Sequence, residues 1–295
     1  MASNQHQIGI YYGYFVTDRT DDYVPLVKRA AELGFDALEI SLVPLIDKPA
    51  SWLERLVEAK TQAEIDLYFT TALAPGRNIA SDEQSEREKG LDFLGKSLKV
   101  MHQLEGKTMN GMLYGTWMSA PENIAGGREH YLPNCVDSMK RLAKRAAELD
   151  ITLNLEIVNR FEQFMLNTTR QGVEFLDMVD EPNVKLHLDT FHMNIEETDL
   201  REAILRAKGR IGFFHVNENN RQLPHTDSRM NWPGIAAALK QAGYSGPIVI
   251  ESVVRPHCQF AQFFRIWRDL ANPPGDVDYD SAAARSRAFL AEIFQ

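Results

Sequence analysis

Eight short apolar runs rich in Ile, Val, Leu and aromatic residues recur along the chain of 295 residues, and an amphipathic stretch follows each of them. Such runs are typical of buried β-strands, and the stretches between them carry apolar residues at the three- and four-residue spacing of helices. The expected strands cover residues 8–15, 37–42, 67–73, 108–115, 152–158, 184–190, 211–218 and 247–254. Eight alternating units without a long linker favour a closed α/β fold, the (β/α)8 TIM barrel, over an open parallel sheet.

The pattern predicts a single TIM barrel domain over residues 1–295. Because α/β barrels often reach about 250 residues as one unit, and 44% of the residues are hydrophobic, the chain can build one large core. The tail at residues 276–294 shows a further helical pattern, so we expect an extra C-terminal helix packed on the barrel or on a sister subunit. No G-x-G-x-x-G follows the first strand, which removes the usual dinucleotide fingerprint.

Charge and hydropathy restrict the partners that the protein is expected to have. The net charge of −9 argues against nucleic acid, whose phosphate backbone is usually bound by a basic face. No apolar run approaches the roughly 18 residues needed to cross a bilayer, and the first residues lack the pattern of a signal peptide. We therefore expect a cytoplasmic protein without a nucleic-acid or membrane partner. Cys135 and Cys258 fit no metal spacing and are interpreted as ordinary thiols.

One ligand-type side chain stands near the end of each of the last four expected strands. These side chains are Glu156, Asp189, His215 and Glu251. Any one of them alone is more simply explained as a helix cap or a hydrogen-bonded core group. In a barrel, however, the active site gathers where strands end and βα loops begin, so four consecutive strands bring these groups to one place.

Three carboxylates buried side by side are costly unless a cation neutralises them. A divalent metal does so, and three carboxylate oxygens with one imidazole nitrogen form a mostly hard site. Such a site suits Mn²⁺, Mg²⁺ or Co²⁺ better than a thiolate-rich zinc site does. His192, three residues after Asp189, is expected to face a substrate bound there.

Three segments carry a resemblance to a known family: "LEIVNRFEQFMLNT" at 155–168, "LDTFHMNIEE" at 188–197 and "WRDL" at 267–270. Here the chain resembles the D-tagatose 3-epimerase and D-allulose (D-psicose) 3-epimerase family of xylose isomerase-like barrels. The resemblance implies that Mn²⁺, or Co²⁺ or Mg²⁺, is held by Glu156, Asp189, His215 and Glu251. It also implies that Glu156 and Glu251 carry the proton, and that the sugar is bound by Glu162, His192 and Arg221.

By this resemblance the protein is a metal-dependent ketose 3-epimerase, acting on a small ketose through a cis-enediolate and forming a homodimer or homotetramer. The expected pairs are D-tagatose and D-sorbose, D-fructose and D-allulose, or ketopentoses. An aldose–ketose or hydroxypyruvate-type isomerase on the same barrel is the alternative. A phosphodiesterase like the endonuclease IV branch needs more histidines and a basic groove. A catalytically inactive sugar-binding module is disfavoured because both proton-carrying glutamates are present.

The chain departs from the family pattern around the expected substrate mouth. Asn217 stands where the family usually has glycine, Ser252 stands where proline is common, and the loop at 222–232 is longer and more polar. Because these changes border the expected substrate mouth, the preferred sugar follows less securely from the resemblance than the chemistry does. Aromatic side chains near the same barrel end are candidates for walling off the sugar carbons beyond C3, and the sequence does not decide among Tyr11, Tyr14, Tyr114 and Trp117.

Overall fold

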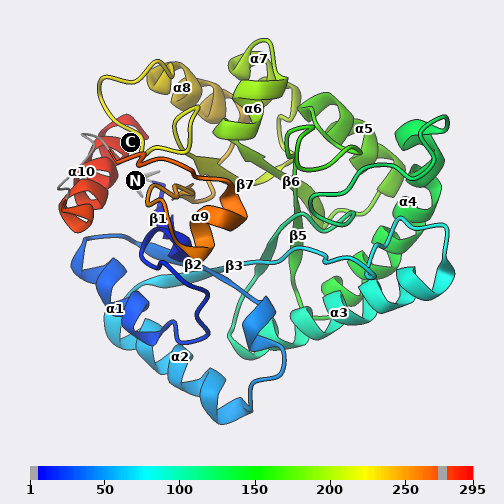
Figure 1. Cartoon of the computed structure of the whole chain (residues 1–295), viewed down its shortest axis with the longest axis horizontal. Helices are drawn as coiled ribbons and strands as arrows, with labels where there is room; N and C mark the ends of the chain where they lie inside the picture. Colours follow the sequence, from blue (N-terminus) through cyan, green and yellow to red (C-terminus); the bar gives the residue numbers. More distant parts are fainter. Residues whose placement is uncertain (1–5, 272–277, 295) are drawn as a thin grey trace.

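The computed structural model describes residues 6–271 and 278–294, and within them eight parallel strands close into a barrel in sequence order (Figure 1). The strands are β1 (Ile8–Tyr11), β2 (Ala37–Ser41), β3 (Asp66–Thr70), β4 (Thr108–Gly111), β5 (Thr152–Glu156), β6 (Val184–Asp189), β7 (Ile211–Val216) and β8 (Ile248–Ile250). Each strand pairs with the next, and β8 pairs with β1. The predicted TIM barrel is confirmed.

Helices cover the outside of this barrel. They are α1 (Val24–Glu32), α2 (Ala50–Ala63), α3 (Gln84–Gln103), α4 (Gly127–Ala147), α5 (Thr169–Val179), α6 (Thr190–Glu196), α7 (Leu200–Arg206), α8 (Trp232–Ala242), α9 (Gln259–Phe264) and α10 (Tyr279–Ile293), with short 3₁₀ turns η1 (Tyr12–Tyr14) and η2 (Val43–Leu45). Within the described residues, no helix has the length and apolar character that a membrane span requires.

Several strands are shorter than predicted because the apolar runs continue into the loops of the site. Residues 12–14 leave β1 as the turn η1, and β8 ends at Ile250, so Glu251 is the first residue beyond the strand. After β8, the long apolar pattern at 260–271 gives only the short α9. That helix ends at Arg265, which has a left-handed backbone with φ of 58°.

Polar side chains fill the middle of the barrel, while the apolar side chains of the strands face the helices. Asn154 donates to Asn110 at 2.8 Å, and Asn110 donates to Glu39 at 3.3 Å. All three side chains are fully buried. Gly212 is required beside them, since a Cβ at that position would lie 1.9 Å from the Asn154 side-chain oxygen. The barrel interior therefore already contains a polar network below the expected site.

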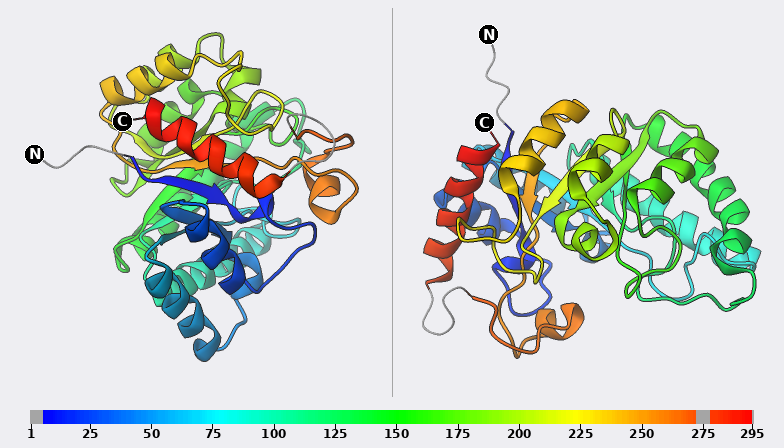
Figure 2. Two further views of the ribbon diagram at one scale, coloured as in Figure 1. Left: turned by 90° about the vertical axis from the view of Figure 1, so that its left-hand side faces the viewer. Right: turned by 90° about the horizontal axis from the view of Figure 1, so that it is seen from above.

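The extra C-terminal helix is present as α10, and it lies against β1 and α8 (Figure 2). Arg29 on α1 binds Asp280 through two hydrogen bonds of 2.9 and 2.6 Å. Ser286 donates to the Pro224 carbonyl at 2.8 Å, which ties α10 to the loop before α8. The helix thus packs on the barrel, which is one of the two arrangements predicted from the sequence. Residues 276 and 277 of the predicted segment lie outside the described residues.

Candidate active site

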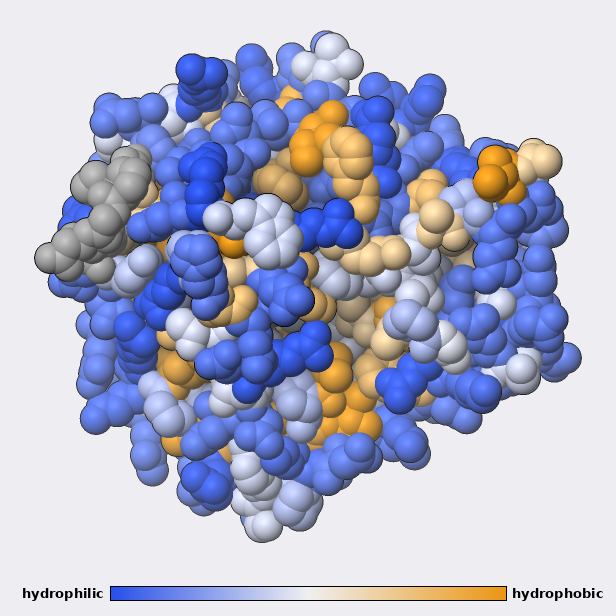
Figure 3. All heavy atoms as spheres, in the orientation of Figure 1, coloured by the Kyte–Doolittle hydropathy of each residue, from blue (hydrophilic) through white to orange (hydrophobic). Residues whose placement is uncertain are grey.

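A cavity of about 750 Å³ opens at the carboxyl ends of the strands. Figure 3 shows this face of the molecule, with hydrophobic side chains gathered around its middle. Of the residues predicted for the site, the cavity is lined by Glu156, Glu162, His192, Arg221 and Glu251. Asp189 and His215 are at most 1% exposed and lie next to these groups. The barrel therefore brings all seven predicted residues together.

The four predicted metal ligands form one compact cluster. Glu156, Asp189, His215 and Glu251 each offer a ligand atom, and these atoms lie within 4.8 Å of one another. His215 Nδ1 is 3.9 Å from Glu156 Oε1, 4.0 Å from Asp189 Oδ2 and 3.7 Å from Glu251 Oε2. The strand ends thus place one imidazole nitrogen among three carboxylates, which makes the cluster a candidate metal centre.

The orientation of His215 is fixed from behind by Glu39. His215 Nε2 lies 2.6 Å from Glu39 Oε2, so Nε2 carries the proton and donates it to the carboxylate. His215 Nδ1 is buried and has no hydrogen-bond partner in the described residues. In the neutral imidazole the lone pair of Nδ1 faces the three carboxylates, as in a metal-binding histidine held by a second carboxylate. This orphaned nitrogen fits a divalent ion bound at the cluster.

Glu39 is not among the residues predicted for the site. The signal was present, because Glu39 is a carboxylate in the middle of the apolar run at 37–42 and is 0% exposed in the structure. A buried carboxylate needs a charged or hydrogen-bonding partner. That partner, His215, is 176 residues away in the chain, so no local pattern pointed to it.

The electrostatics of the cluster favour bound positive charge. Burial, together with the nearby Glu156 and Asp189 carboxylates, raises the pKa of Glu251 to about 8 despite the opposing Arg221 and His215. Burial lowers the pKa of His215, but Glu39 and Glu251 outweigh it and raise that pKa to about 10. With no cation bound, the cluster retains protons that a solvated carboxyl or imidazole would release. A divalent ion supplies the same compensation.

Asp189 serves as a helix cap and as a member of the cluster at the same time. Its Oδ1 accepts from the Phe191 backbone N–H at 2.7 Å and caps α6. Its Oδ2 remains on the side of His215 and His192. The cap holds the carboxylate in one rotamer, so the other oxygen points steadily at the metal position.

Glu162 and His192 sit together at one wall of the cavity. Glu162 Oε2 accepts from Trp117 Nε1 at 2.9 Å, and Glu162 Oε1 accepts from Asn159 at 3.1 Å. The Asn159 backbone N–H also donates to His192 Nδ1 at 3.2 Å, which leaves His192 Nε2 as the donor facing Glu156 at 3.6 Å. Burial opposes ionisation of Glu162, but His192 and Arg221 hold the pKa of its carboxyl below the ordinary value.

Arg221 is buried in the site and does not behave as a solvated loop base. Its guanidinium donates to Glu251 and lies 3.4 Å from Asp189 and 3.8 Å from Glu162. The guanidinium carbon lies over the Phe191 ring, 4.1 Å from its centroid. Arg221 has a left-handed backbone with φ of 69°, an uncommon conformation for a non-glycine residue. The loop after β7 is thus strained at the residue that reaches the carboxylates.

Two of the four candidate aromatic residues line the cavity, namely Tyr11 and Trp117. Tyr14 instead donates to the Tyr279 carbonyl at the start of α10. Tyr114 is fully buried and donates to the Leu166 carbonyl at 3.3 Å. Tyr11 and Trp117 therefore remain candidates for walling off the sugar carbons beyond C3, whereas Tyr14 and Tyr114 do not line the cavity.

Two residues that depart from the family pattern, Asn217 and Ser252, lie just after β7 and β8, next to the site. Asn217 donates to the Glu251 carbonyl at 3.0 Å, and Ser252 donates to the Gln222 carbonyl at 3.0 Å. Both side chains are fully buried. Glu218 accepts from Trp232 Nε1 at 3.1 Å and so anchors the loop that follows Arg221. These residues connect the ends of β7 and β8 and do not face the cavity.

Known proteins share the fold of this chain over nearly its whole length. A family model described as "Xylose isomerase-like TIM barrel" matches residues 27–284. D-psicose 3-epimerase of Enterocloster bolteae is 31% identical over 289 residues, covering 97% of this chain and 95% of that protein. L-ribulose 3-epimerase of Methylomonas sp. is 34% identical over 273 residues, covering 91% and 90%. The solved D-psicose 3-epimerase of Clostridium cellulolyticum with D-tagatose superposes with a TM-score of 0.92 at 31% identity, over 98% and 99% of the two chains.

Proposed function

The chain belongs to the xylose isomerase-like TIM barrel family and, within it, to the ketose 3-epimerases, and on this premise we propose that it interconverts C3 epimers of a free ketose with a bound divalent ion. One observation carries the proposal. The three carboxylates and one imidazole of the cluster lie within 4.8 Å of one another, in contact with the cavity that Glu162, His192 and Arg221 line.

The ion would be held by Glu156, Asp189, His215 and Glu251, and Mn²⁺ is the metal we propose, with Co²⁺ or Mg²⁺ able to replace it. A bound ion of this kind acts as a Lewis acid toward the sugar oxygens, which makes the C3 proton easier to remove. The single nitrogen and three oxygens of the ligand set match the preference of these hard ions.

Glu156 and Glu251 are proposed as the acid and base. Glu156 is the last residue of β5 and Glu251 directly follows β8. These are the two ends of the arc of strands that forms the site, so the two carboxylates approach a sugar between them from different sides. One carboxylate takes the C3 proton and the other returns a proton to the opposite face, through a cis-enediolate of the sugar. This arrangement inverts the configuration at C3 and leaves the carbonyl at C2.

Three further residues are proposed to orient the substrate. His192 presents its Nε2–H toward the cluster, and Arg221 brings its guanidinium to the same carboxylates. Both donors suit the C1 and C2 oxygens, where negative charge develops during proton transfer. Glu162, fixed by Trp117 and Asn159, is proposed to accept a sugar hydroxyl.

The substrate class follows from the relatives and from the cavity. The similar proteins are named for D-psicose and L-ribulose, a ketohexose and a ketopentose. A free ketohexose or ketopentose is therefore proposed here, with the C3 pairs D-tagatose and D-sorbose or D-fructose and D-allulose foremost. Tyr11 and Trp117 supply the apolar wall of the cavity for the carbons beyond C3.

A cytoplasmic homodimer or homotetramer is proposed as the working form. Phe161 and Trp267 are each 69% exposed and border the same apolar hollow beside the active site. Large aromatic side chains exposed in one patch are typical of surfaces that pair with another protein surface. Light scattering after size-exclusion chromatography measures the oligomeric state directly.

Turnover of a ketose in D₂O tests the proposed reaction. We expect the recovered sugar to carry deuterium at C3, to keep its carbonyl at C2 and to differ from the substrate only in C3 configuration, as read by NMR. The label follows the carbon that lies between the two glutamates. Deuterium confined to C1 or C2, with an aldose as the main product, would identify an aldose–ketose isomerase and overturn the proposal.

A further inference from the structure

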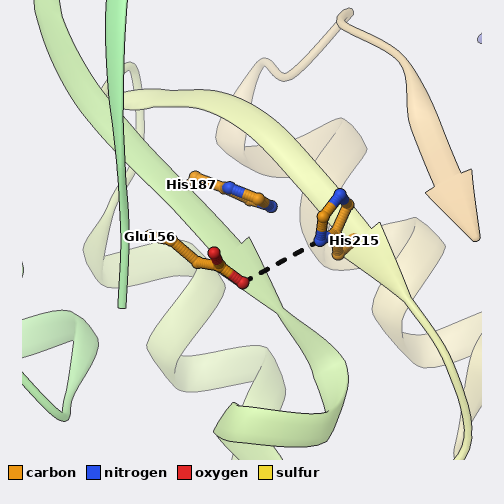
Figure 4. Close-up of side chains that lie close together, drawn as sticks. All are labelled: Glu156, His187 and His215. Carbon is orange, nitrogen blue, oxygen red and sulfur yellow. Dashed lines mark ion pairs between the residues drawn. The ribbon is translucent and has the colours of Figure 1, made fainter. Parts of the chain in front are cut away.

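A second histidine lies beneath the proposed metal ligands and has no part in the proposed reaction. His187 on β6 precedes Asp189 by two residues, so both side chains point into the barrel. His187 is 0% exposed and stands in register with Glu156 on the neighbouring β5. Its ring meets the His215 ring edge to face, with the centroids 4.1 Å apart. Figure 4 shows Glu156, His187 and His215 converging from three adjacent strands.

The polar atoms of His187 are unsatisfied. Neither of its ring nitrogens has a hydrogen-bond partner in the described parts of the chain, although both are buried. A neutral imidazole has one N–H donor and one lone pair, so His187 has a nitrogen that can act as a metal ligand. A buried polar group without a partner is destabilising, so its presence in a folded protein needs an explanation, and a bound ion supplies one.

The lone pair of His187 is within reach of two other ligand atoms. An oxygen of Glu156, a nitrogen of His187 and a nitrogen of His215 lie within 4.8 Å of one another. This set differs from the outer cluster because it has two imidazoles and one carboxylate, without Asp189 and Glu251. Imidazole-rich sets favour Zn²⁺, Cu²⁺ and Ni²⁺, whereas carboxylate-rich sets suit Mg²⁺ and Mn²⁺.

We propose that Glu156, His187 and His215 form an inner metal position for nitrogen-preferring transition ions, beside the outer position of Glu156, Asp189, His215 and Glu251. The inference goes beyond the proposed function, which uses only the outer position. An ion in the inner position lacks Asp189 and Glu251 as ligands, so it is not placed for the proposed reaction. His187 thereby determines which metals bind at the position used for catalysis.

The two positions compete for the same atoms. Glu39 occupies His215 Nε2, so His215 has only Nδ1 to offer to either ion. Glu156 is also common to both sets. We therefore expect one ion per chain, bound in the outer position when it is Mn²⁺ and in the inner position when it is Zn²⁺.

X-ray absorption at the zinc edge tests this assignment on the 295-residue protein loaded with one equivalent of Zn²⁺. We expect two imidazoles per zinc in the wild type and one in His187→Leu. The matched control is Phe213→Leu, which changes a ring that packs against His187, 5.0 Å between centroids, without removing a nitrogen. It should retain two imidazoles.

Competition titration of the same proteins with Zn²⁺ and Mn²⁺ gives a second readout. Loss of a residue that only hydrogen-bonds to a metal ligand lowers metal affinity by about 10- to 100-fold. His187→Leu removes a ligand itself, so it should lower the preference for Zn²⁺ over Mn²⁺ by at least this factor. Phe213→Leu should leave that ratio near the wild-type value.

A single imidazole on zinc in the wild-type protein would overturn the inner position, and that measurement needs no variant to fold. A water molecule bonded to His187 in crystals of the zinc-loaded protein, with zinc in the outer cluster, would do the same. Neither experiment involves a sugar. Their failure therefore leaves the proposed epimerase activity standing, and failure of the labelling experiment in D₂O leaves the zinc result standing.

Discussion

At the scale of single residues, three of the predicted site residues, His215, Asp189 and His192, are each held by a second hydrogen bond on the side away from the metal position. Glu39 fixes the tautomer of His215, the Phe191 backbone N–H fixes Asp189, and the Asn159 backbone N–H fixes His192. Catalytic geometry depends on such supports, because a side chain free to rotate spends little time in the productive orientation. The ligands themselves were predictable from their positions at strand ends. The cap at Asp189 is local, but the supports of His215 and His192 were not predictable, because they join residues 176 and 33 positions apart in the chain.

The support from Glu39 can be tested directly. Glu39→Ala should lower the affinity for Mn²⁺ by about 10- to 100-fold, since His215 then loses the acceptor that directs Nδ1 toward the carboxylates. Glu39→Gln, which keeps an acceptor oxygen for the His215 N–H, should lose less. Isothermal titration of metal-stripped protein measures both affinities. Equal Mn²⁺ affinity in wild type and Glu39→Ala would mean that Glu39 does not orient the ligand.

The two proposed proton carriers should be the most sensitive positions in the chain. Glu156→Gln and Glu251→Gln keep the size of the side chain but cannot carry the proton, and each also weakens a metal ligand. We expect kcat to fall by about 10²- to 10⁴-fold in each variant, measured at saturating Mn²⁺ and ketose. Glu202→Gln, on the exposed face of α7, serves as the control and should match the wild type. Near-normal turnover in Glu251→Gln would rule out the scheme with two bases.

At the scale of elements, the periodic segments were predicted and the segments that form the site were not. Alternating apolar runs and amphipathic stretches correctly gave eight strands and the helices between them. The predicted ends were wrong where an apolar run extends past its strand, as at Tyr12 and at Val253. In both places the extra apolar residues pack beneath the loops of the site. Hydrophobic patterning therefore predicts where the strands and helices of the barrel lie in the sequence. The conformation of the loops is determined by contacts between distant segments, which the pattern does not contain.

The loop from β5 to α5, which carries Glu162, is closed by a capping box. Thr168 accepts from the Gln171 backbone N–H, and the Gln171 side chain accepts from the Thr168 backbone N–H. Thr168→Ala should lower the free energy of unfolding by about 1 kcal/mol, whereas Thr168→Ser should preserve it. Denaturant titration gives the difference. A loss shared equally by both variants would point to the missing methyl group and not to the cap.

At the scale of the whole molecule, closing the barrel brings carboxylates from distant parts of the chain into one polar interior. The network from Asn154 through Asn110 and Glu39 to His215 crosses from β5 to β7 by way of β2 and β4. Strand order in a TIM barrel follows sequence order, so the meeting of the last four strand ends was predictable. The placement of Glu39 and His187 depends on which side chains fill the barrel centre. The hydrogen bonds of Glu39 and the ring packing of His187 arise across the barrel, and no sequence period encodes them.

Because the unfolded chain does not gather these carboxylates, metal binding should stabilise the whole fold. A ligand at 100 times its Kd adds about 2.7 kcal/mol to the free energy of unfolding. At about 2.1 cal/mol/K per residue, a chain of 295 residues unfolds with an entropy of about 0.6 kcal/mol/K, so Tm should rise by about 4 °C. Calorimetry of chelated protein, with and without added Mn²⁺, measures this shift.

The same experiment on Asp189→Asn separates specific binding from a general effect of the salt. Asp189 is fully buried in the cluster, and its loss removes a charged ligand while the amide still has an oxygen with which to cap α6. The rise in Tm with Mn²⁺ should shrink in this variant. In Asp227→Asn, which changes an exposed carboxylate outside the cluster, the rise should persist. If Mn²⁺ shifted the Tm of Asp189→Asn as much as that of the wild type, the stabilising ion would be bound elsewhere, and the cluster at the strand ends would lose its assignment as the metal centre.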